Sequence, residues 1–130
     1  ALPICTKFKS IAPQFVVPDV VKAAEYYRDV LGFRINGYFL DPPVFAMVER
    51  DGLVIQLGKI DREVDPAPNS VRRKLGLDAY IWVSDVDDLY DEYKERGADI
   101  IDGPVNRVYN CREIVVRDLY GFIIAFGADI

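Results

Sequence analysis

The sequence predicts an α+β domain in which two tandem β-α-β-β-β modules form a curved mixed sheet with a cleft. The first observation is that patterns typical of a strand, an amphipathic helix and three strands occur twice in the same order. The second is that short motifs repeat: Val17-Pro18-Asp19-Val20 matches Val83-Ser84-Asp85-Val86, and Gly52 to Gly58 matches Gly121 to Gly127. The third is size, because 130 residues, of which 51% are hydrophobic, suffice for the core of one domain.

The first module begins with a strand and a helix. Ile11 to Val17 is an apolar run rich in strand-forming residues, and Asp19, after Pro18, is a suitable helix N-cap. Gly32 is expected to end the helix. The apolar residues that recur at helical spacing, and so form its buried face, are Val20, Ala23, Ala24, Tyr27, Val30 and Leu31. Turn residues then separate three predicted strands, Phe33 to Leu40, Val44 to Arg50 and Leu53 to Gly58.

The second module repeats this order after a polar connector, residues 60–76, which is rich in proline and charge. Asp85 is the expected N-cap of its helix and Gly97 the expected end. The predicted strands are Asp78 to Ser84, residues 99–106, Cys111 to Arg117 and Phe122 to Phe126. The resulting division has an N-terminal extension at 1–10 and a single domain at 11–130, with module one at 11–59, the connector at 60–76 and module two at 77–128.

Charge and hydropathy exclude two classes of partner. Sixteen Lys and Arg against 21 Asp and Glu give a net charge of −5, which repels nucleic acid and anionic lipid and favours cationic ligands. No apolar run is long enough to span a bilayer, and the first residues do not resemble a secretion signal. We therefore expect a soluble, cytoplasmic protein that binds neither nucleic acid nor membrane.

The sequence contains no histidine, which removes the commonest side chain for acid-base catalysis near neutral pH and for binding transition metals. Its two cysteines, Cys5 and Cys111, do not have the spacing of a zinc site or a redox pair. Both are expected to be ordinary buried or half-buried thiols.

Two motifs carry a family resemblance that covers residues 11–128. One is the helix pattern from Val20 to Phe33, and the other is the ending Arg112-Glu113-Ile-Val-Val-Arg117-Asp-Leu-Tyr-Gly121. In this order, and with this duplication, the chain resembles the vicinal oxygen chelate superfamily of glyoxalases, extradiol dioxygenases, fosfomycin-resistance enzymes and bleomycin-resistance binding proteins. The ending resembles the bleomycin-resistance branch, although Leu-Tyr-Gly-Phe replaces its Pro-Asp-Gly-Asn turn. The resemblance implies the glyoxalase/bleomycin-resistance fold.

Enzymes of this superfamily bind a divalent ion through residues on the first and fourth strands of each module. The repeat places Gln14, Gln56, Tyr80 and Ala125 at these positions. Two neutral amides, a protonated phenol and a methyl group provide no negative ligand to offset the cost of dehydrating the ion. The sequence therefore predicts no metal and no other cofactor, and a purely cleft-lining role for these side chains.

Strand alternation predicts which other residues line the cleft. A two-residue turn at Asp51-Gly52 pairs Met47 with Gln56, and a turn at Asp41-Pro42 places Tyr38 opposite Phe45. In module two, Trp82 shares the face of Tyr80, and Arg112 and Ile114 are expected to share the face of Ala125. The predicted ligand-binding residues are Gln14, Tyr38, Phe45, Met47, Gln56, Tyr80, Trp82, Arg112 and Ile114.

Aromatic rings with a few polar groups suit a planar organic ligand. The favoured function is therefore metal-independent binding or sequestration of a small aromatic molecule, neutral or cationic, by a homodimer similar to the bleomycin-resistance group. A homodimer is expected because apolar cleft residues on a curved sheet would leave an exposed apolar patch in a lone chain.

Several alternatives stay open at the level of sequence. Trp82 and Phe45 are alternatively core residues between the two modules, and Arg112 is alternatively a solvated partner of Glu113 or Asp118. The main alternative function is an enzyme. It would be either a lyase or dioxygenase with atypical metal ligands, or a metal-free catalyst that uses Glu113, Asp99 or Tyr80 as acid or base. A regulatory or structural module is a third class.

Overall fold

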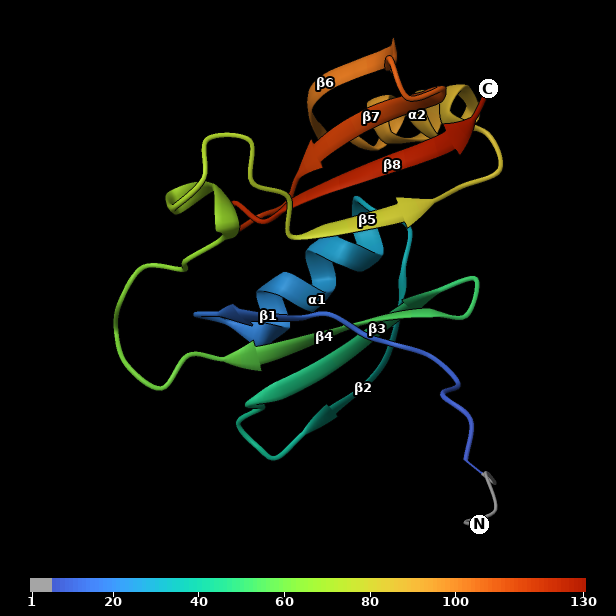
Figure 1. Cartoon of the computed structure of the whole chain (residues 1–130). Helices are drawn as coiled ribbons and strands as arrows, with labels where there is room; N and C mark the ends of the chain where they lie inside the picture. The colour runs from blue at the N-terminus through green and yellow to red at the C-terminus, as the bar shows by residue number, and fades with distance from the viewer. Residues whose placement is uncertain (1–5) are drawn as a thin grey trace, which may run out of the picture.

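The computed structural model describes residues 6–130 and contains the β-α-β-β-β order twice (Figure 1). Module one consists of β1 (Gln14–Val17), α1 (Val20–Asp29), β2 (Arg34–Phe39), β3 (Phe45–Arg50) and β4 (Leu53–Lys59). Module two consists of β5 (Ala79–Trp82), α2 (Val86–Arg96), β6 (Asp99–Asn106), β7 (Cys111–Arg117) and β8 (Ile123–Asp129). The predicted α+β fold class is confirmed.

Three further predictions concern the ends, the connector and the cysteines. The connector contains one short 3-10 helix, Asn69–Val71. Cys111 is a buried free thiol, whereas Cys5 and half of the predicted N-terminal extension lie outside the described residues. Across residues 6–130, no helix is both long enough and apolar enough to cross a membrane.

Each module folds into its own mixed four-stranded sheet. The strand orders are β1-β4-β3-β2 and β5-β8-β7-β6, and in each sheet the first pair is parallel while the other two are antiparallel. Alternate side chains on each sheet pack against the helix of that module. We call this the inner face of the sheet and the opposite side the outer face.

The predicted caps hold both helices at their expected starts. Asp19 Oδ1 accepts hydrogen bonds from the backbone N–H groups of Val21 and Lys22, each at 3.0 Å. Asp85 Oδ1 accepts one from Asp88 N–H at 3.0 Å, and Gly97 ends α2 with a left-handed φ of 80°. The capped ends fix where the following strands begin.

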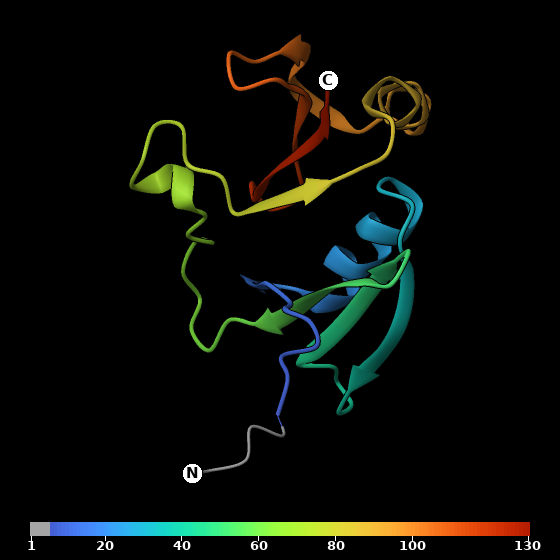
Figure 2. The same ribbon diagram turned by 45° about the vertical axis from the view of Figure 1, so that its right-hand side comes forward.

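The core lies between the modules and joins them. Figures 1 and 2 both show α1 between the two sheets. Tyr27, from α1, donates a hydrogen bond to Asp118 of module two at 2.7 Å, and Tyr93, from α2, donates one to the Leu31 carbonyl of module one at 2.8 Å. Each helix thus contributes a fully buried tyrosine to the other module, and these two hydrogen bonds link the modules.

Candidate functional site

The outer face of module one carries the predicted amides and two of the predicted apolar side chains. In the register, Gln56 lies beside both Gln14 and Met47, as predicted. Gln14 Nε2 donates a hydrogen bond to Gln56 Oε1 at 3.1 Å. Phe45 is opposite Gly58 on the same face and stays outside the buried core. The two amides therefore form one polar group on an otherwise apolar surface.

The prediction that Tyr38 shares this face is wrong. Tyr38 pairs with Ala46, an inner-face residue, whereas Phe39 pairs with Phe45. A bulge between Ile35 and Gly37 shifts the register of β2. The outer-face aromatic on β2 is consequently Phe39, which is 60% exposed. A shallow pocket of about 400 Å³ opens here, lined by Asn36, Gly37, Tyr38, Phe39, Phe45 and Met47.

The outer face of module two carries a pair of aromatic rings. Tyr80 and Trp82 lie on the same side of the edge strand β5, with ring centroids 4.8 Å apart, and Tyr80 is in register with Ala125 as predicted. Trp82 is 60% exposed. The alternative interpretation of Trp82 as core is therefore wrong, and its indole is accessible to a ligand.

The predicted faces of Arg112 and Ile114 are also wrong. Ala125 pairs with Val115, so Ile114 turns to the inner face, where it is fully buried. Arg112 turns the same way and forms an ion pair with Asp87 of α2 at 2.9 Å, so its partner is neither of those considered from the sequence. The turn from Asp118 to Phe122 is one residue longer than expected, and a shift of one residue exchanges the two faces of a strand.

That shift brings Glu113 onto the outer face. Its side chain is buried, with only 3% of the residue exposed, and it accepts three hydrogen bonds. Tyr80 Oη and Tyr109 Oη donate to Oε2 at 2.6 and 2.8 Å, and Arg107 Nε donates to Oε1 at 2.9 Å. Arg107 also forms an ion pair with Asp102 at 2.7 Å. We call Glu113, Tyr80, Tyr109 and Arg107 the Glu113 cluster.

Ionisation within the Glu113 cluster is well defined. Burial acts to raise the pKa of Glu113, but hydrogen bonds from Tyr80, Arg107 and Tyr109 outweigh it and leave the pKa below its ordinary value. Burial and the bond to Glu113 raise the pKa of Tyr80, and the bond to Glu113 likewise raises the pKa of Tyr109. Near neutral pH the cluster therefore holds one carboxylate and two protonated phenols.

A glycine on β8 makes room for this arrangement. Gly127 is opposite Glu113, and a Cβ atom at this position would overlap the Tyr80 hydroxyl. The phenol of Tyr80 therefore lies directly over the backbone of β8 on its way to Glu113. At Gly58, the equivalent glycine of module one, an added Cβ atom would lie 3.4 Å from its nearest neighbour, Gln14 Oε1, so that position is less crowded.

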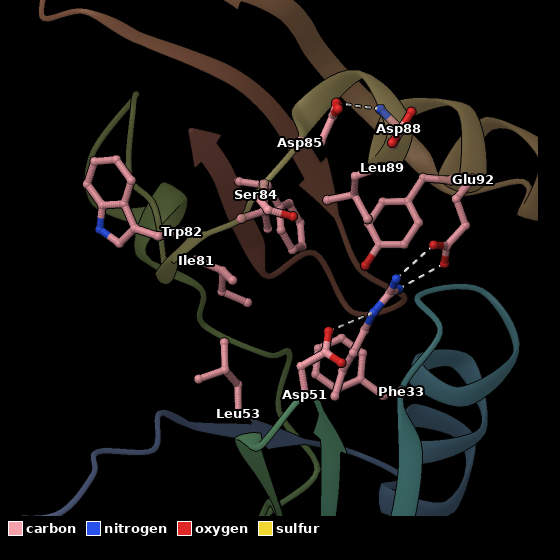
Figure 3. Close-up of a pocket in the computed structure, with 14 residues that line it drawn as sticks. Phe33, Asp51, Leu53, Ile81, Trp82, Ser84, Asp85, Asp88, Leu89 and Glu92 are labelled. Carbon is pink, nitrogen blue, oxygen red and sulfur yellow. Dashed lines mark hydrogen bonds and ion pairs between the residues drawn. The ribbon is translucent and has the colours of Figure 1, made fainter. Parts of the chain in front are cut away.

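A crevice of about 440 Å³ lies where the two modules meet, and Trp82 is among the residues that line it (Figure 3). Arg50 Nη1 and Nη2, from β3, bind the carboxylate of Glu92, from α2, at 2.8 and 2.7 Å. Figure 3 shows Leu53 and Ile81 pointing toward one another, whereas the Trp82 ring points away from the crevice. No sequence pattern indicates this ion pair, because its partners belong to different modules. Its contacts identify the crevice as part of the module junction.

The residues at the family's metal positions do not fit a divalent ion. The Gln14 and Gln56 amides bond to one another, the protonated Tyr80 hydroxyl donates a hydrogen bond to Glu113, and Ala125 has no ligand atom. Within residues 6–130, no group of three or more His, Cys, Asp or Glu is arranged to hold a metal. What the outer faces do offer is aromatic surface and hydrogen-bonding groups.

Comparison with known proteins agrees with this architecture. The model of the Glyoxalase/Bleomycin resistance protein/Dioxygenase superfamily matches residues 7–126. No curated protein sequence matches the chain. Among solved structures, TioX from Micromonospora sp. ML1 is 21% identical with a TM-score of 0.74, covering 95% of this chain and 100% of TioX.

Two other similar structures are described as a binding protein and as an enzyme. The bleomycin-binding protein of Streptomyces verticillus, in complex with copper(II)-bleomycin, is 21% identical with a TM-score of 0.72, covering 97% of this chain and all of that protein. A glyoxalase-related enzyme from Clostridium phytofermentans is 17% identical with a TM-score of 0.70, covering 98% and 100%. At these identities the structures show a shared fold. Because the family model spans nearly the whole duplicated fold, the chain belongs to the glyoxalase/bleomycin resistance protein/dioxygenase superfamily.

Proposed function

We propose that the protein binds and sequesters a small planar aromatic molecule, neutral or cationic, on its outer sheet faces and without a metal ion. The observation that carries this proposal is the exposed indole of Trp82, packed beside Tyr80 on the outer face of module two. A large aromatic side chain that is exposed at the edge of a polar cluster is typical of a ligand contact. Phe39, Phe45 and Met47 supply similar surface on module one.

The polar groups of the two faces support a ligand that is not anionic. The Glu113 cluster, together with Asp102, contains two carboxylates and one guanidinium, and the whole chain carries a charge of −5. Arg107 Nε and Nη2 donate hydrogen bonds to Glu113 and Asp102, respectively. A cationic or neutral aromatic would therefore meet a favourable field, and an anionic one would not.

The similar structures support a binding role in a general way. The bleomycin-binding protein of Streptomyces verticillus is solved with a copper(II)-bleomycin ligand and shares the fold over its full length. An antibiotic-like aromatic is therefore a reasonable ligand class for this chain, and antibiotic resistance by sequestration a reasonable role. Bleomycin itself is one candidate of that class.

Metal-free acid-base catalysis, one of the alternatives considered from the sequence, has less support. Glu113 is ionised, but its carboxylate already accepts three hydrogen bonds and is shielded from solvent. Tyr80 has a raised pKa, because of burial and its bond to Glu113, and its hydroxyl donates a hydrogen bond to that carboxylate. Asp99 forms an ion pair with Arg117 at 2.9 Å at the start of β6, away from the cluster. None of these groups is free to accept a substrate proton.

A fluorescence titration tests the binding proposal. Trp82 is the only tryptophan in the chain, so its emission reports this site once the emission of the naphthyl probe, measured without protein, is subtracted. Chelator-treated protein titrated with 1-naphthylmethylammonium, a planar aromatic cation, is expected to show a saturable change in emission. A signal that appears only after Zn²⁺ or Mn²⁺ is added would contradict metal-free binding.

We further propose that the protein is a homodimer that acts in the cytoplasm on a small molecule and not on nucleic acid or membrane. The exposed apolar side chains of module one, Phe39 and Leu40 among them, support a second copy as their cover. Sedimentation at micromolar concentration is expected to give twice the mass of the 14.7 kDa chain. A single species at the monomer mass would contradict the dimer.

A further inference from the structure

The Glu113 cluster has a property that depends on where its hydrogen atoms lie. An ionised carboxylate can only accept hydrogen bonds, so each phenol that bonds to it must use its single O–H as the donor. Tyr80 and Tyr109 both bond to the same oxygen, Glu113 Oε2, at 2.6 and 2.8 Å. The two hydroxyl hydrogens are thus committed to Glu113, and the two phenol oxygens lie close together on one group.

What remains on each phenol oxygen is its lone pairs. A hydroxyl whose hydrogen is committed can only accept a hydrogen bond from a third partner. Tyr109 is 58% exposed, and Tyr80 is only partly buried beside Trp82, so both rings border the outer face. We propose that Glu113 sets the hydrogen-bond polarity of this face, so that Tyr80 and Tyr109 act as acceptors and select aromatic ligands that carry N–H donors.

The chemical class that satisfies this face is a planar aromatic bearing a protonated amine or an amidinium group. The ring would stack on the Trp82 indole while the N–H groups donate to the Tyr80 and Tyr109 oxygens, backed by the negative charge of Glu113 and Asp102. Arg107 does not reverse this preference, because its positive charge is paired with two carboxylates, Glu113 and Asp102. The inference rests on the proposed binding function and narrows its ligand from neutral or cationic to donor-bearing.

Glu113 is a positioning residue in this scheme. It is shielded from solvent and acts through the two phenols and not by touching the ligand. Its replacement by Gln keeps the size but supplies an N–H group that can donate to a phenol oxygen, which frees a phenol hydrogen. The Glu113→Gln variant should therefore lose the preference for donor-bearing ligands while it keeps the aromatic surface of Trp82.

The test compares two probes that share a ring system: 1-naphthylmethylammonium, which carries N–H donors, and 1-(methoxymethyl)naphthalene, which carries none. Dissociation constants are read from the NMR shift of the Trp82 indole N–H. The parent is expected to bind the ammonium at least about tenfold more tightly than the ether, as one hydrogen bond to a charged group provides. In Glu113→Gln the ratio should approach one.

Two further variants guard against a trivial explanation. Asp91→Asn removes one exposed carboxylate from the surface of α2 and should leave the ratio unchanged, which separates polarity from net charge. Tyr109→Phe deletes one acceptor oxygen and should weaken ammonium binding severalfold with no effect on the ether. This variant also serves if Glu113→Gln does not fold.

The outcomes separate this inference from the binding proposal on which it rests. If both probes shift the Trp82 signal with equal affinity, or if Glu113→Gln keeps the parent's ratio, the polarity inference is overturned and aromatic binding stands. If neither probe shifts the Trp82 signal at any accessible concentration, the proposed binding site itself is wrong.

Discussion

Replacing Trp82 by alanine separates a ligand-contacting indole from a structural one. Complete removal of a buried aromatic side chain costs about 3 to 5 kcal/mol. Trp82 is 60% exposed, so about two fifths of that penalty applies, and the free energy of unfolding should fall by about 1 to 2 kcal/mol. The variant should therefore fold and show a slightly lower urea midpoint.

Ligand binding should respond much more strongly than stability. Truncating an aromatic anchor of a binding site commonly costs 2 kcal/mol or more, which is about a thirtyfold loss of affinity. Isothermal titration calorimetry with 1-naphthylmethylammonium measures this loss without the tryptophan signal that the variant lacks. Tyr80→Phe, which keeps the ring and removes the hydroxyl, is a milder change on the same face.

Leu53→Ala is a matched control for Trp82→Ala. Leu53 is 50% exposed but points into the crevice between the modules and not onto an outer face. Its truncation should lower stability modestly and leave affinity unchanged. A folded Trp82→Ala protein that binds as tightly as the parent, or one that loses more than about 3 kcal/mol of stability, would refute the assignment of Trp82 to the site.

Three further predictions concern the junction and the Glu113 cluster. Tyr27→Phe removes a buried donor to Asp118, and should lower the free energy of unfolding by about 1 to 3 kcal/mol in urea titrations; an unchanged midpoint would contradict a structural bond there. Gly127→Ala should displace Tyr80 and weaken ammonium binding in calorimetry, whereas the same change at Gly58 should have little effect on it. The folded pKa of Glu113 lies below its ordinary value of 4.5, so its ionised form stabilises the fold above that pH, and this stability is lost as pH falls through the folded pKa. The difference in unfolding free energy between the parent and Glu113→Gln should therefore shrink below pH 4.5. A difference that does not change with pH would contradict this prediction.

Local sequence chemistry was sufficient to predict the fold. Asp19 and Asp85 cap the two helices as expected, and the buried face of α1 contains Val20, Ala23 and Tyr27 at helical spacing. These signals depend only on neighbouring residues and on the apolar period. The repeat then fixed which strands correspond, so the pairs Gln14 with Gln56 and Tyr80 with Ala125 were placed correctly.

The errors arose where strand register depends on irregular backbone. The bulge in β2 exchanged Tyr38 for Phe39, and the longer turn before β8 exchanged Arg112 and Ile114 for Glu113 and Val115. Neither feature has a local sequence signal as clear as a two-residue turn. The sequence contained one clue to the register of β7. Pairing its apolar residues Ile114 and Val116 with Phe126 and Ile124 of β8 would have placed Ile114 on the inner face.

The cluster around Glu113 was harder to predict because its members come from different elements. Tyr109 and Arg107 lie in the turn between β6 and β7, and Tyr80 reaches Glu113 from β5 across Gly127. Only the strand order β5-β8-β7 brings these groups together. Glu113 and Tyr80 were considered from the sequence as catalytic groups, but their mutual hydrogen bond leaves neither free to exchange a proton with a substrate.

Native mass spectrometry of the protein purified without chelator tests the central claim of metal-free ligand binding most directly. It measures the mass of the assembly and of anything bound to it in one experiment. The expected result is the apoprotein, or the protein with an organic adduct that carries no metal, together with mass shifts for added 1-naphthylmethylammonium. One tightly held Zn, Mn, Fe or Ni ion per chain that survives gel filtration, with no binding of the naphthyl probe after its removal, would contradict the account.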